Sequence, residues 1–501
     1  MPPHPRNRRL AILLALIALD ALVTAFFVFR GPAETDTARY ALDFYRWMRG
    51  EKELAGLFNA EMSFGFYAGL AAWQRLHPVS LAALPDLLNW ISWGCGVLAT
   101  GACYLWWERW WDGRVATRLT LLFIATPAYW SLHLYGNTNI IGLALAAAAV
   151  AATPGSDGPA GSAGSARQIG RTILAVSLGI ATLCVRTDLI LLAPALAAFV
   201  LWGRDRPSRR MAIFIFAASL AGYALLRWMA VGSGGAGGTL ARHWGSNLSL
   251  SDPRWLLGSF LQNSVFLGSA GPPLIFLASV IAFFGVSRAR VRPATLLWIA
   301  PAALFVFFSR VHLTRILLPQ LPGVLLPLAV WATEGGRRRD LALAGIVLSA
   351  HLVMGAVPSL METARRDDSH PPRVNHYFFR GIAVRDHLTI QHTTDELLAD
   401  ARGLVEEIEA DSAGIAIVGE DVVCYELYLE SRHPGSRVTR VGRRYQVDLQ
   451  RMDIPGHGAP VYLLMPRWGE DPSIALREFG VPDGVRPRYT RFESRLRGRS
   501  P

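Results

Sequence analysis

Long apolar runs recur along the first two thirds of this chain, and they constrain its fold more than any other feature. About 20 apolar residues cross the hydrocarbon core of a bilayer as a helix. Charged residues make up 18% of the 501 residues, below the roughly 25% of a soluble domain, and the mean hydropathy is +0.28. The sequence therefore predicts a polytopic α-helical membrane protein. About eleven runs are interpreted as transmembrane helices: 10–29, 79–107, 117–134, 138–153, 172–186, 188–202, 211–231, 271–287, 294–309, 316–333 and 341–357.

The distribution of arginine indicates how these helices are oriented, because short cytoplasmic loops are enriched in Lys and Arg. Compact basic clusters occupy the N-terminal tail, 106–114, the end of 154–171, 203–210, 287–292 and 334–340. Eleven crossings that begin inside place all of these clusters in the cytoplasm. The net charge of +12 is then explained by topology and by contact with membrane lipids, and no nucleic acid partner is expected. The first run is interpreted as an uncleaved helix, because it is long and lacks a clear cleavage site.

The composition changes near residue 358 and divides the chain into two parts. Residues 1–358 form the multi-pass membrane domain, and residues 359–501 are polar and rich in arginine. In the second part, helical spacing at 395–412 and short apolar strands at 414–419 and 460–465 predict a small α/β domain. The topology places this C-terminal domain outside, with the N-terminus in the cytoplasm. If the source is bacterial, the membrane is the inner (plasma) membrane.

Three further segments are set apart by composition. The Gly- and Ser-rich stretch 153–166 is expected to be a flexible cytoplasmic loop. Segments 58–76 and 254–271 are apolar but interrupted by polar residues, which predicts helices that lie along the outer membrane interface. Asp20, in the middle of the first run, is costly in lipid and is expected to face the bundle and bond to a neighbouring helix.

Polar residues between the apolar runs fall on the face opposite the basic clusters. They follow the first run, occupy two turns between later runs, and precede 316–333. A shared depth in the membrane follows from the predicted topology, although proximity does not. The residues are Glu34, Asp36, Tyr40 and Asp43, then Asn137 and Asn139, then Arg186 and Asp188, and finally Arg310, His312 and Arg315.

The chemistry of this set suits a reaction on a lipid-linked phosphate. Carboxylates act as general bases or hold a divalent cation, and the forked donors of arginine match phosphate oxygens. Each residue also has a structural alternative. Asp36 is equally compatible with a capping role, Arg186 and Asp188 with an ion pair at a turn, and His312 and Arg315 with interfacial side chains that extend toward water.

Three motifs resemble the GT-C superfamily of glycosyltransferases that use polyprenyl-phosphate sugars. The branch they resemble most contains protein O-mannosyltransferases and lipid A aminoarabinose transferases. The motifs are Glu34-Thr-Asp36 followed by Tyr40, the hairpin GIATLCVRTDLILLAPALAAF at 179–199, and HLTRILLPQLP at 312–322. Two departures concern the sugar and the acceptor more than the fold. Ile316 stands where an aromatic is usual, and SFGFYAGL replaces a proline-rich stretch before the second apolar run.

The resemblance implies an inverting transfer from a polyprenyl-phosphate-linked sugar to a hydroxyl of a lipid, glycan or protein acceptor. Asp36 would be the general base, and Glu34 would assist by orientation or by metal binding. Arg186, His312 and Arg315 would stabilise the departing lipid phosphate. The resemblance assigns no cofactor with certainty, and a divalent cation (Mg or Mn) at Glu34 and Asp36 is left open.

Three other functions stay open at the level of the sequence. A lipid-linked oligosaccharide polymerase or ligase would use similar cations but depend less on Asp36. A transporter or flippase is disfavoured, because no internal repeat is evident and the polar residues lie at one face rather than at midplane. A catalytically inactive scaffold, with the C-terminal domain as its binding part, is the third.

Overall fold

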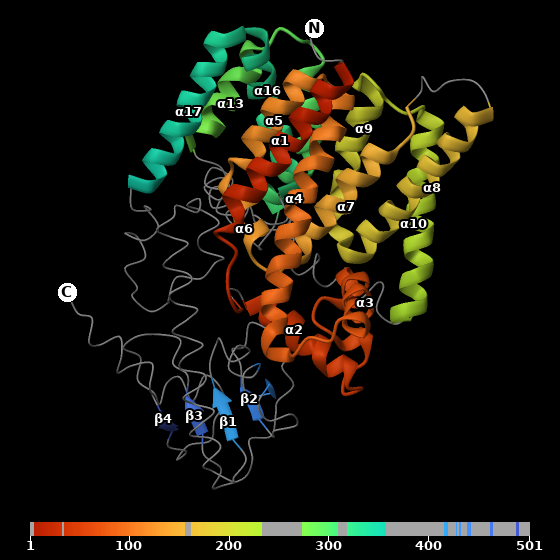
Figure 1. Ribbon diagram of the computed structural model, residues 1–501, viewed down its shortest axis with the longest axis vertical. Helices are drawn as coiled ribbons and strands as arrows, with labels where there is room; N and C mark the ends of the chain where they lie inside the picture. The colour runs from red at the N-terminus through yellow and green to blue at the C-terminus, as the bar shows by residue number, and fades with distance from the viewer. Residues whose placement is uncertain are drawn as a thin grey trace.

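The helices of the computed structural model form one bundle, with a small sheet beyond the end of the bundle that lies away from the chain's N-terminus (Figure 1). The structure describes residues 5–32, 35–155, 162–232, 273–308 and 318–356, and in the C-terminal part only short segments at 415–418, 427, 430–431, 438–441, 461–463 and 487–489.

Fourteen α-helices and four 3-10 helices lie in the described residues between 5 and 356. In chain order they are α1 (Pro5–Ala25), α2 (Thr35–Met48), η1 (Leu54–Gly56), α3 (Ala60–Leu76), η2 (Leu81–Ala83), α4 (Leu84–Trp110), α5 (Gly113–Ile124), α6 (Pro127–Leu134), α7 (Thr138–Ala152), α8 (Ser162–Val185), η3 (Thr187–Leu192), α9 (Ala193–Trp202), α10 (Arg209–Val231), α13 (Pro273–Gly285), α14 (Val291–Phe308), η4 (Leu318–Gln320), α16 (Leu321–Glu334) and α17 (Gly336–Ala356).

Most predicted runs coincide with helices, but their boundaries and number differ. The predicted run 117–134 is two helices, because Thr126 is extended before Pro127 and the chain turns there. Helix α8 begins at Ser162, so the predicted flexible loop 153–166 is wrong over its last five residues. In the described chain, three helical spans are long and apolar enough by themselves to cross a membrane: Leu81–Trp110, Ala166–Val185 and Arg209–Val231. A count of eleven crossings therefore stays a prediction.

Helices α2 and α3 lie together at the end of the bundle away from the N-terminus (Figure 1). The helix predicted within 58–76 is found as α3, and its place along the membrane interface stays a prediction. The second such segment, 254–271, lies outside the described residues. Helix α2 was not predicted from the sequence. Charged residues separate its apolar positions, so the segment resembles a polar loop.

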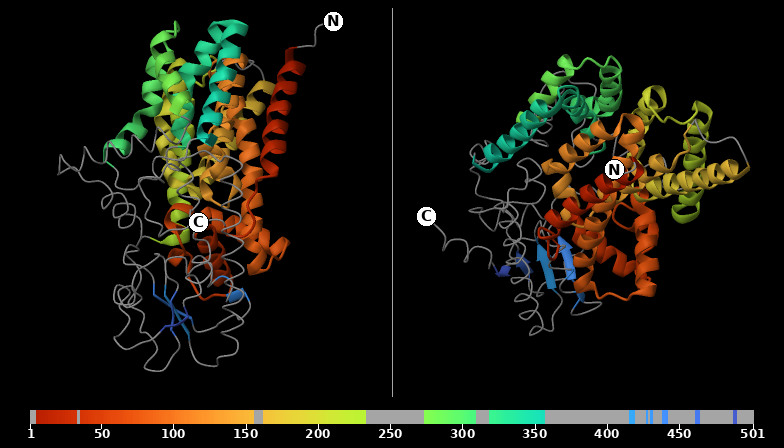
Figure 2. Two further views of the ribbon diagram at one scale, coloured as in Figure 1. Left: turned by 90° about the vertical axis from the view of Figure 1, so that its left-hand side faces the viewer. Right: turned by 45° about the horizontal axis from the view of Figure 1, so that its top comes forward.

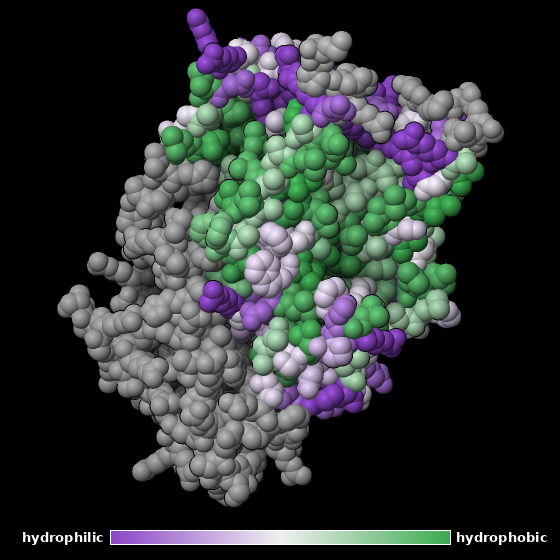
Figure 3. Space-filling view, in the orientation of Figure 1, coloured by the Kyte–Doolittle hydropathy of each residue, from purple (hydrophilic) through white to green (hydrophobic). Residues whose placement is uncertain are grey.

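The predicted basic clusters gather at the opposite end, which also carries the chain's N-terminus. In Figure 3 this end is a hydrophilic band above a broad hydrophobic belt. Ion pairs between clusters that are distant in sequence hold the band together: Arg9 with Glu108, Arg109 with Asp205, Arg118 with Asp340, and Arg288 with both Asp112 and Glu334. One face of the bundle is thus basic, as the positive-inside reading requires.

A stack of tryptophans fixes the centre of this bundle. Trp106 and Trp110 are four residues apart and so share one face of α4. The Trp298 ring of α14 lies against both, at centroid distances of 5.4 and 4.9 Å. Its indole Nε1 donates to the carbonyl of Pro319 at 2.9 Å, which ties η4 and the start of α16 to the stack. Rigid packing of α4 follows, and α4 carries several residues that position the candidate site.

The C-terminal part contains a four-stranded parallel sheet in the order β2-β1-β3-β4. The strands are β1 (Ile415–Val418), β2 (Val438–Val441), β3 (Val461–Leu463) and β4 (Pro487–Tyr489). Strands β1 and β3 lie within the two predicted strands, 414–419 and 460–465. The helix predicted at 395–412 lies outside the described residues, so an α/β domain from 359 to 501 stays a prediction.

Candidate functional site

The connection between α1 and α2 is held in place by side chains at the start of α4. Gly31, whose φ of 69° suits glycine, donates its backbone N–H to Asp86 Oδ1 at 2.6 Å. The amide of Asn89 donates to the carbonyls of Phe29 and Gly31 at 2.8 and 2.9 Å. Asn89 also accepts from the N–H of Gly136 at 2.7 Å. One buried asparagine therefore fixes both the entry to α2 and the turn before α7.

Asp36 lies in the first turn of α2, half buried. A carboxylate is stabilised at this place by the positive end of the helix dipole, so the capping interpretation and the catalytic one remain compatible. Tyr40 follows one turn later on the same face of the helix. Its hydroxyl lies 3.4 Å from Thr138 Oγ1 at the start of α7. The helix that carries Asp36 is thereby joined to the next turn of predicted site residues.

Thr138 also joins this turn to Arg186. The Arg186 Nη1 donates to Thr138 Oγ1 at 3.2 Å, and the guanidinium forms a fork with Asp188 at 2.8 and 3.1 Å. The arginine is buried, with 6% of its surface exposed. Helix α7 packs closely against Arg186 because residue 142 is a glycine: a Cβ added there would lie 2.9 Å from Arg186 Cβ. The structure thus brings Tyr40, Arg186 and Asp188 into one network.

Asn137 and Asn139 belong to the same turn, at the beginning of α7. The Asn137 side chain caps the helix by accepting from the N–H groups of Asn139 and Ile140 at 2.9 and 3.3 Å. Its amide donates to two carbonyls of the preceding turn, those of Leu132 and Tyr135. Asn137 therefore has a complete structural role, while Asn139 is buried beside it.

Asp43 has partners that hold the loop after α2. Its carboxylate accepts from Lys52 Nζ at 2.6 Å and from the backbone N–H of Phe58 at 2.8 Å. These bonds connect α2 to the segment before α3. Asp43 is on the predicted face of the protein, and its contacts support a role in positioning the loop.

Three residues of this network were not singled out from the sequence. Thr138 is the link between Tyr40 and Arg186, Asn59 donates to the Tyr40 hydroxyl at 3.3 Å, and Tyr67 lies at 5.9 Å from the Tyr40 ring. Burial first, and then the nearby Tyr40, Asp43 and Asp36, raise the pKa of the Tyr67 phenol well above its ordinary value. The sequence Asn137-Thr138-Asn139 could have indicated the threonine, but only its two asparagines were predicted as site residues.

The remaining predicted site residues, Glu34, Arg310, His312 and Arg315, lie outside the described residues. Within the part of the chain that the structure describes, no three His, Cys, Asp or Glu side chains lie close enough together to hold a metal ion. Asp36 is the one carboxylate of the predicted metal pair in that part, so a cation at Glu34 and Asp36 stays a prediction.

Asp20 of α1 is buried and hydrogen-bonded to neighbouring helices, as predicted. Its Oδ2 accepts from Thr100 Oγ1 at 2.7 Å and from the Tyr129 hydroxyl at 2.9 Å, and the His133 Nδ1 lies 3.7 Å from its Oδ1. Gly96 leaves room for this histidine, since an added Cβ would lie 2.3 Å from the ring. The cluster joins α1, α4 and α6 inside the bundle.

These features define a class of protein: a membrane-embedded helical bundle with one basic face and a connected polar site at the opposite face. A scan against protein-family models finds no match, and a search of curated proteins finds none either.

Two solved structures of ArnT, both of low sequence identity, share the fold. ArnT from Cupriavidus metallidurans bound to undecaprenyl phosphate aligns with a TM-score of 0.54 at 15% identity, over 87% of this chain and 86% of that one. Its apo state aligns with a TM-score of 0.56 at 15% identity, over 88% and 87%. The oligosaccharyltransferase AglB from Archaeoglobus fulgidus aligns at a TM-score of 0.45 and 13% identity, over 87% of this chain and 64% of that one. The predicted GT-C resemblance is confirmed at the level of the fold by the ArnT structures.

Proposed function

We propose that the chain is an integral membrane glycosyltransferase that moves a sugar from a polyprenyl-phosphate donor to an acceptor hydroxyl. The main support for this proposal is a hydrogen-bond network. In it, Tyr40 and Thr138 connect the helix that carries Asp36 to the buried guanidinium of Arg186. The fold shared with a protein solved with undecaprenyl phosphate supports a lipid-phosphate donor. The reaction would take place at the extracytoplasmic face, opposite the arginine-rich turns.

Asp36 is the proposed general base. It would accept the proton of the acceptor hydroxyl as that oxygen attacks the anomeric carbon, while the bond from that carbon to the lipid phosphate breaks. Attack from the side opposite the leaving group inverts the anomeric centre. Half-burial at the first turn of α2 supports this role, because the carboxylate is held by the helix and still reachable. Glu34 would assist Asp36 by orientation or by metal binding, a role that rests on the sequence motif alone.

Arg186 is the proposed partner of the departing lipid phosphate. Its guanidinium is already oriented by Asp188 and Thr138, so little side-chain entropy would be lost on binding. Preorganised cations stabilise developing charge strongly where water is scarce. His312 and Arg315 would add to this charge, and Arg310, Asn139 and Tyr40 are further candidates for contact with the sugar. The acceptor is a hydroxyl of a lipid, a glycan or a protein.

The test compares Asp36→Asn with a matched carboxylate variant, Glu53→Gln, whose side chain is exposed and does not cap η1. Both are introduced into a strain that lacks the gene, and equal membrane levels are established by immunoblot. Mass spectrometry then measures envelope glycans and polyprenyl-phosphate sugars. We expect Asp36→Asn to lack the glycan and accumulate the donor, with Glu53→Gln like wild type.

Normal glycans in the Asp36→Asn strain would remove Asp36 as the base. Glycan loss without an accumulated monophosphate sugar, and with an accumulated diphosphate-linked oligosaccharide instead, would indicate a polymerase or ligase. Identical profiles of the deletion strain and the wild type would contradict the transferase itself.

A further inference from the structure

A large cavity opens at the basic end of the bundle, far along the helices from the candidate site. Its volume is about 1300 Å³, above the roughly 300–1,000 Å³ of small-molecule sites. Helix α1 packs on α4 and α5, whereas α17 packs on α13 and α16. The cavity is the groove that remains between α1 and α17. In the left view of Figure 2, α17 faces the viewer and α1 stands at the right-hand edge of the bundle. We call it the α1–α17 groove.

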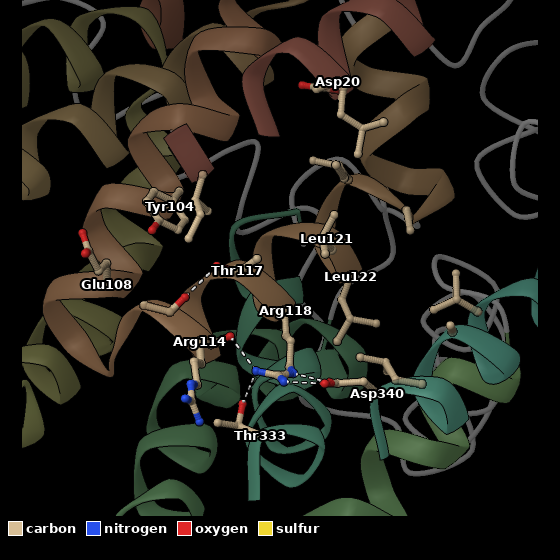
Figure 4. A pocket seen from close by; sticks show the side chains of 18 of the residues that line it. Asp20, Tyr104, Glu108, Arg114, Thr117, Arg118, Leu121, Leu122, Thr333 and Asp340 are labelled. Carbon is tan, nitrogen blue, oxygen red and sulfur yellow. Dashed lines mark hydrogen bonds and ion pairs between the residues drawn. The ribbon is translucent and has the colours of Figure 1, made fainter. Parts of the chain in front are cut away.

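The groove is charged at one end and apolar along its length. Figure 4 shows Arg114, Arg118 and Asp340 at one end, Asp20 at the other, and Leu121 and Leu122 between them. The apolar rim is open to the surroundings, because Leu19 of α1 and Leu348 of α17 are 45% and 62% exposed. An amphipathic ligand with a polar head at the basic end would fit this division.

The charged end has more cations than it needs for its own ion pairs. Its five arginines face three carboxylates, and three of the arginines are paired: Arg9 with Glu108, Arg118 with Asp340 and Arg288 with Asp112. Arg8 and Arg114 are both exposed, and among the described residues neither has a carboxylate oxygen within 4 Å. Two guanidinium groups are therefore available to an anion, which arginine binds well.

The dimensions of the groove match one leaflet of a bilayer. Arg8 and Val23 both line it, and the fifteen helical steps from one to the other rise about 22 Å along α1. Half of a bilayer's hydrocarbon core is about 15 Å thick. The groove thus extends from headgroup level through the depth of one leaflet. Its charge and length together match a lipid of that leaflet better than a soluble anion.

We propose that the α1–α17 groove binds an anionic glycerophospholipid of the leaflet at the basic face, with its phosphate on Arg8 and Arg114 and an acyl chain along Leu121, Val347 and Leu348. This site is separate from the proposed donor site, which lies at the opposite end of the bundle. Its occupancy does not depend on whether the chain transfers sugars.

The first experiment measures lipid binding to the full-length, delipidated protein in detergent. Phosphatidylglycerol and phosphatidylcholine are titrated, and thermal unfolding and native mass spectrometry give the apparent affinity. The test variant is Arg8→Gln with Arg114→Gln, both exposed positions. The control is Arg209→Gln with Arg210→Gln, exposed at the start of α10 and not part of the groove.

Wild type should bind phosphatidylglycerol more tightly than phosphatidylcholine. The test variant should lose on the order of 10- to 30-fold in affinity for phosphatidylglycerol, while the control keeps it. An equal loss in both variants would mean a diffuse attraction to the basic face and would overturn the proposal. So would an absence of preference between the two lipids in wild type.

A second pair of variants tests the apolar part. Ala344→Trp fills the groove from α17, and Ala342→Trp places the same ring on a position of that helix that does not line it. We expect less lipid retained by Ala344→Trp and wild-type retention by Ala342→Trp. Undiminished binding by Ala344→Trp would show that the acyl chain lies elsewhere and would overturn the assignment to the groove.

Discussion

At the scale of single residues, the candidate site depends on a threonine that carries no charge. Thr138 Oγ1 lies within hydrogen-bonding distance of both Tyr40 and Arg186, at 3.4 and 3.2 Å. Because an arginine side chain has many rotamers, each fixed contact reduces the entropy lost when it binds a phosphate. Thr138 is therefore expected to act through Arg186 rather than on the substrate.

Replacing this hydroxyl should weaken donor binding. Thr138→Val keeps the shape of the side chain and removes the bond to Arg186, so we expect KM for a polyprenyl-phosphate sugar to rise several-fold with a smaller change in kcat. Thr172→Val is the control, since among the described residues its hydroxyl bonds to Gln168 within α8 and to Met211. Transfer kinetics in detergent measure both variants, and an unchanged KM for Thr138→Val would contradict the role.

Asp43 should behave differently from Asp36. Asp43→Asn removes the ion pair with Lys52 and weakens the bond to the Phe58 N–H, both of which hold the loop before α3. We expect the free energy of unfolding to fall by about 1–3 kcal/mol, while transfer activity per folded molecule is retained. Differential scanning fluorimetry and a transfer assay on the same sample separate the two. A stable but inactive Asp43→Asn protein would place Asp43 in the chemistry.

At the scale of helices and turns, glycine sets the distance between α7 and the turn that carries Arg186. A Cβ added to Gly142 would lie 2.5 Å from Leu189 Cδ1 and 2.9 Å from Arg186 Cβ. Contacts this short force the two elements apart, because packed side chains leave little free space. The position of Arg186 thus depends on the absence of a side chain one helix away.

Gly142→Ala should therefore lower activity more than its size suggests. We expect at least a tenfold loss of kcat/KM, because small displacements of a positioned group are costly. Gly170→Ala in α8 is the matched control, since nothing lies within 4 Å of its added Cβ and alanine favours the helix. Equal activity of the two variants would show that the α7 contact adjusts freely.

The elements themselves were largely predictable from the sequence, and the exceptions have physical causes. Apolar length located α4, α8 and α10, but periodicity missed the amphipathic α2. Two charged residues of α2 make contacts outside the helix: Asp43 binds the loop before α3, and Arg46 binds Glu430 of the C-terminal part. Pro127 was the visible signal for the break between α5 and α6. The predicted topology placed Asp36 and Arg186 at the same face of the membrane. Their connection through Thr138 depends on how α2, α7 and the turn before η3 pack together, and residue spacing does not predict that packing.

At the scale of the whole molecule, the C-terminal part is tied to the membrane part through α2. Glu430, buried, forms a salt bridge with Arg46 at 2.9 Å and another with Arg49. Burial raises the pKa of the Glu430 carboxyl, but the hydrogen bonds and charges of Arg46 and Arg49 outweigh it, and the pKa is lowered. The ionised glutamate is thus the form that the folded protein prefers.

This contact should make the attachment pH-dependent. A lowered pKa stabilises the docked state fully above the ordinary glutamate value of about 4.3, and the stabilisation is lost as the pH falls through the lowered value. We expect limited proteolysis of the C-terminal part to accelerate in that acidic range. Glu430→Gln should show the faster cleavage at neutral pH, with Glu53→Gln as control. Slow, pH-independent cleavage of the Glu430→Gln protein would show that the salt bridges of Glu430 do not hold the C-terminal part to the membrane part.

The contact of Gly96 with His133 has a consequence for the history of the sequence. A methyl group at position 96 has no room while an imidazole occupies position 133, so the two sites are not free to change independently. Descendants of a common ancestor that gained a larger residue at 96 would have needed a smaller one at 133 first. Substitutions at this pair should therefore appear together, and in that order, across divergent relatives.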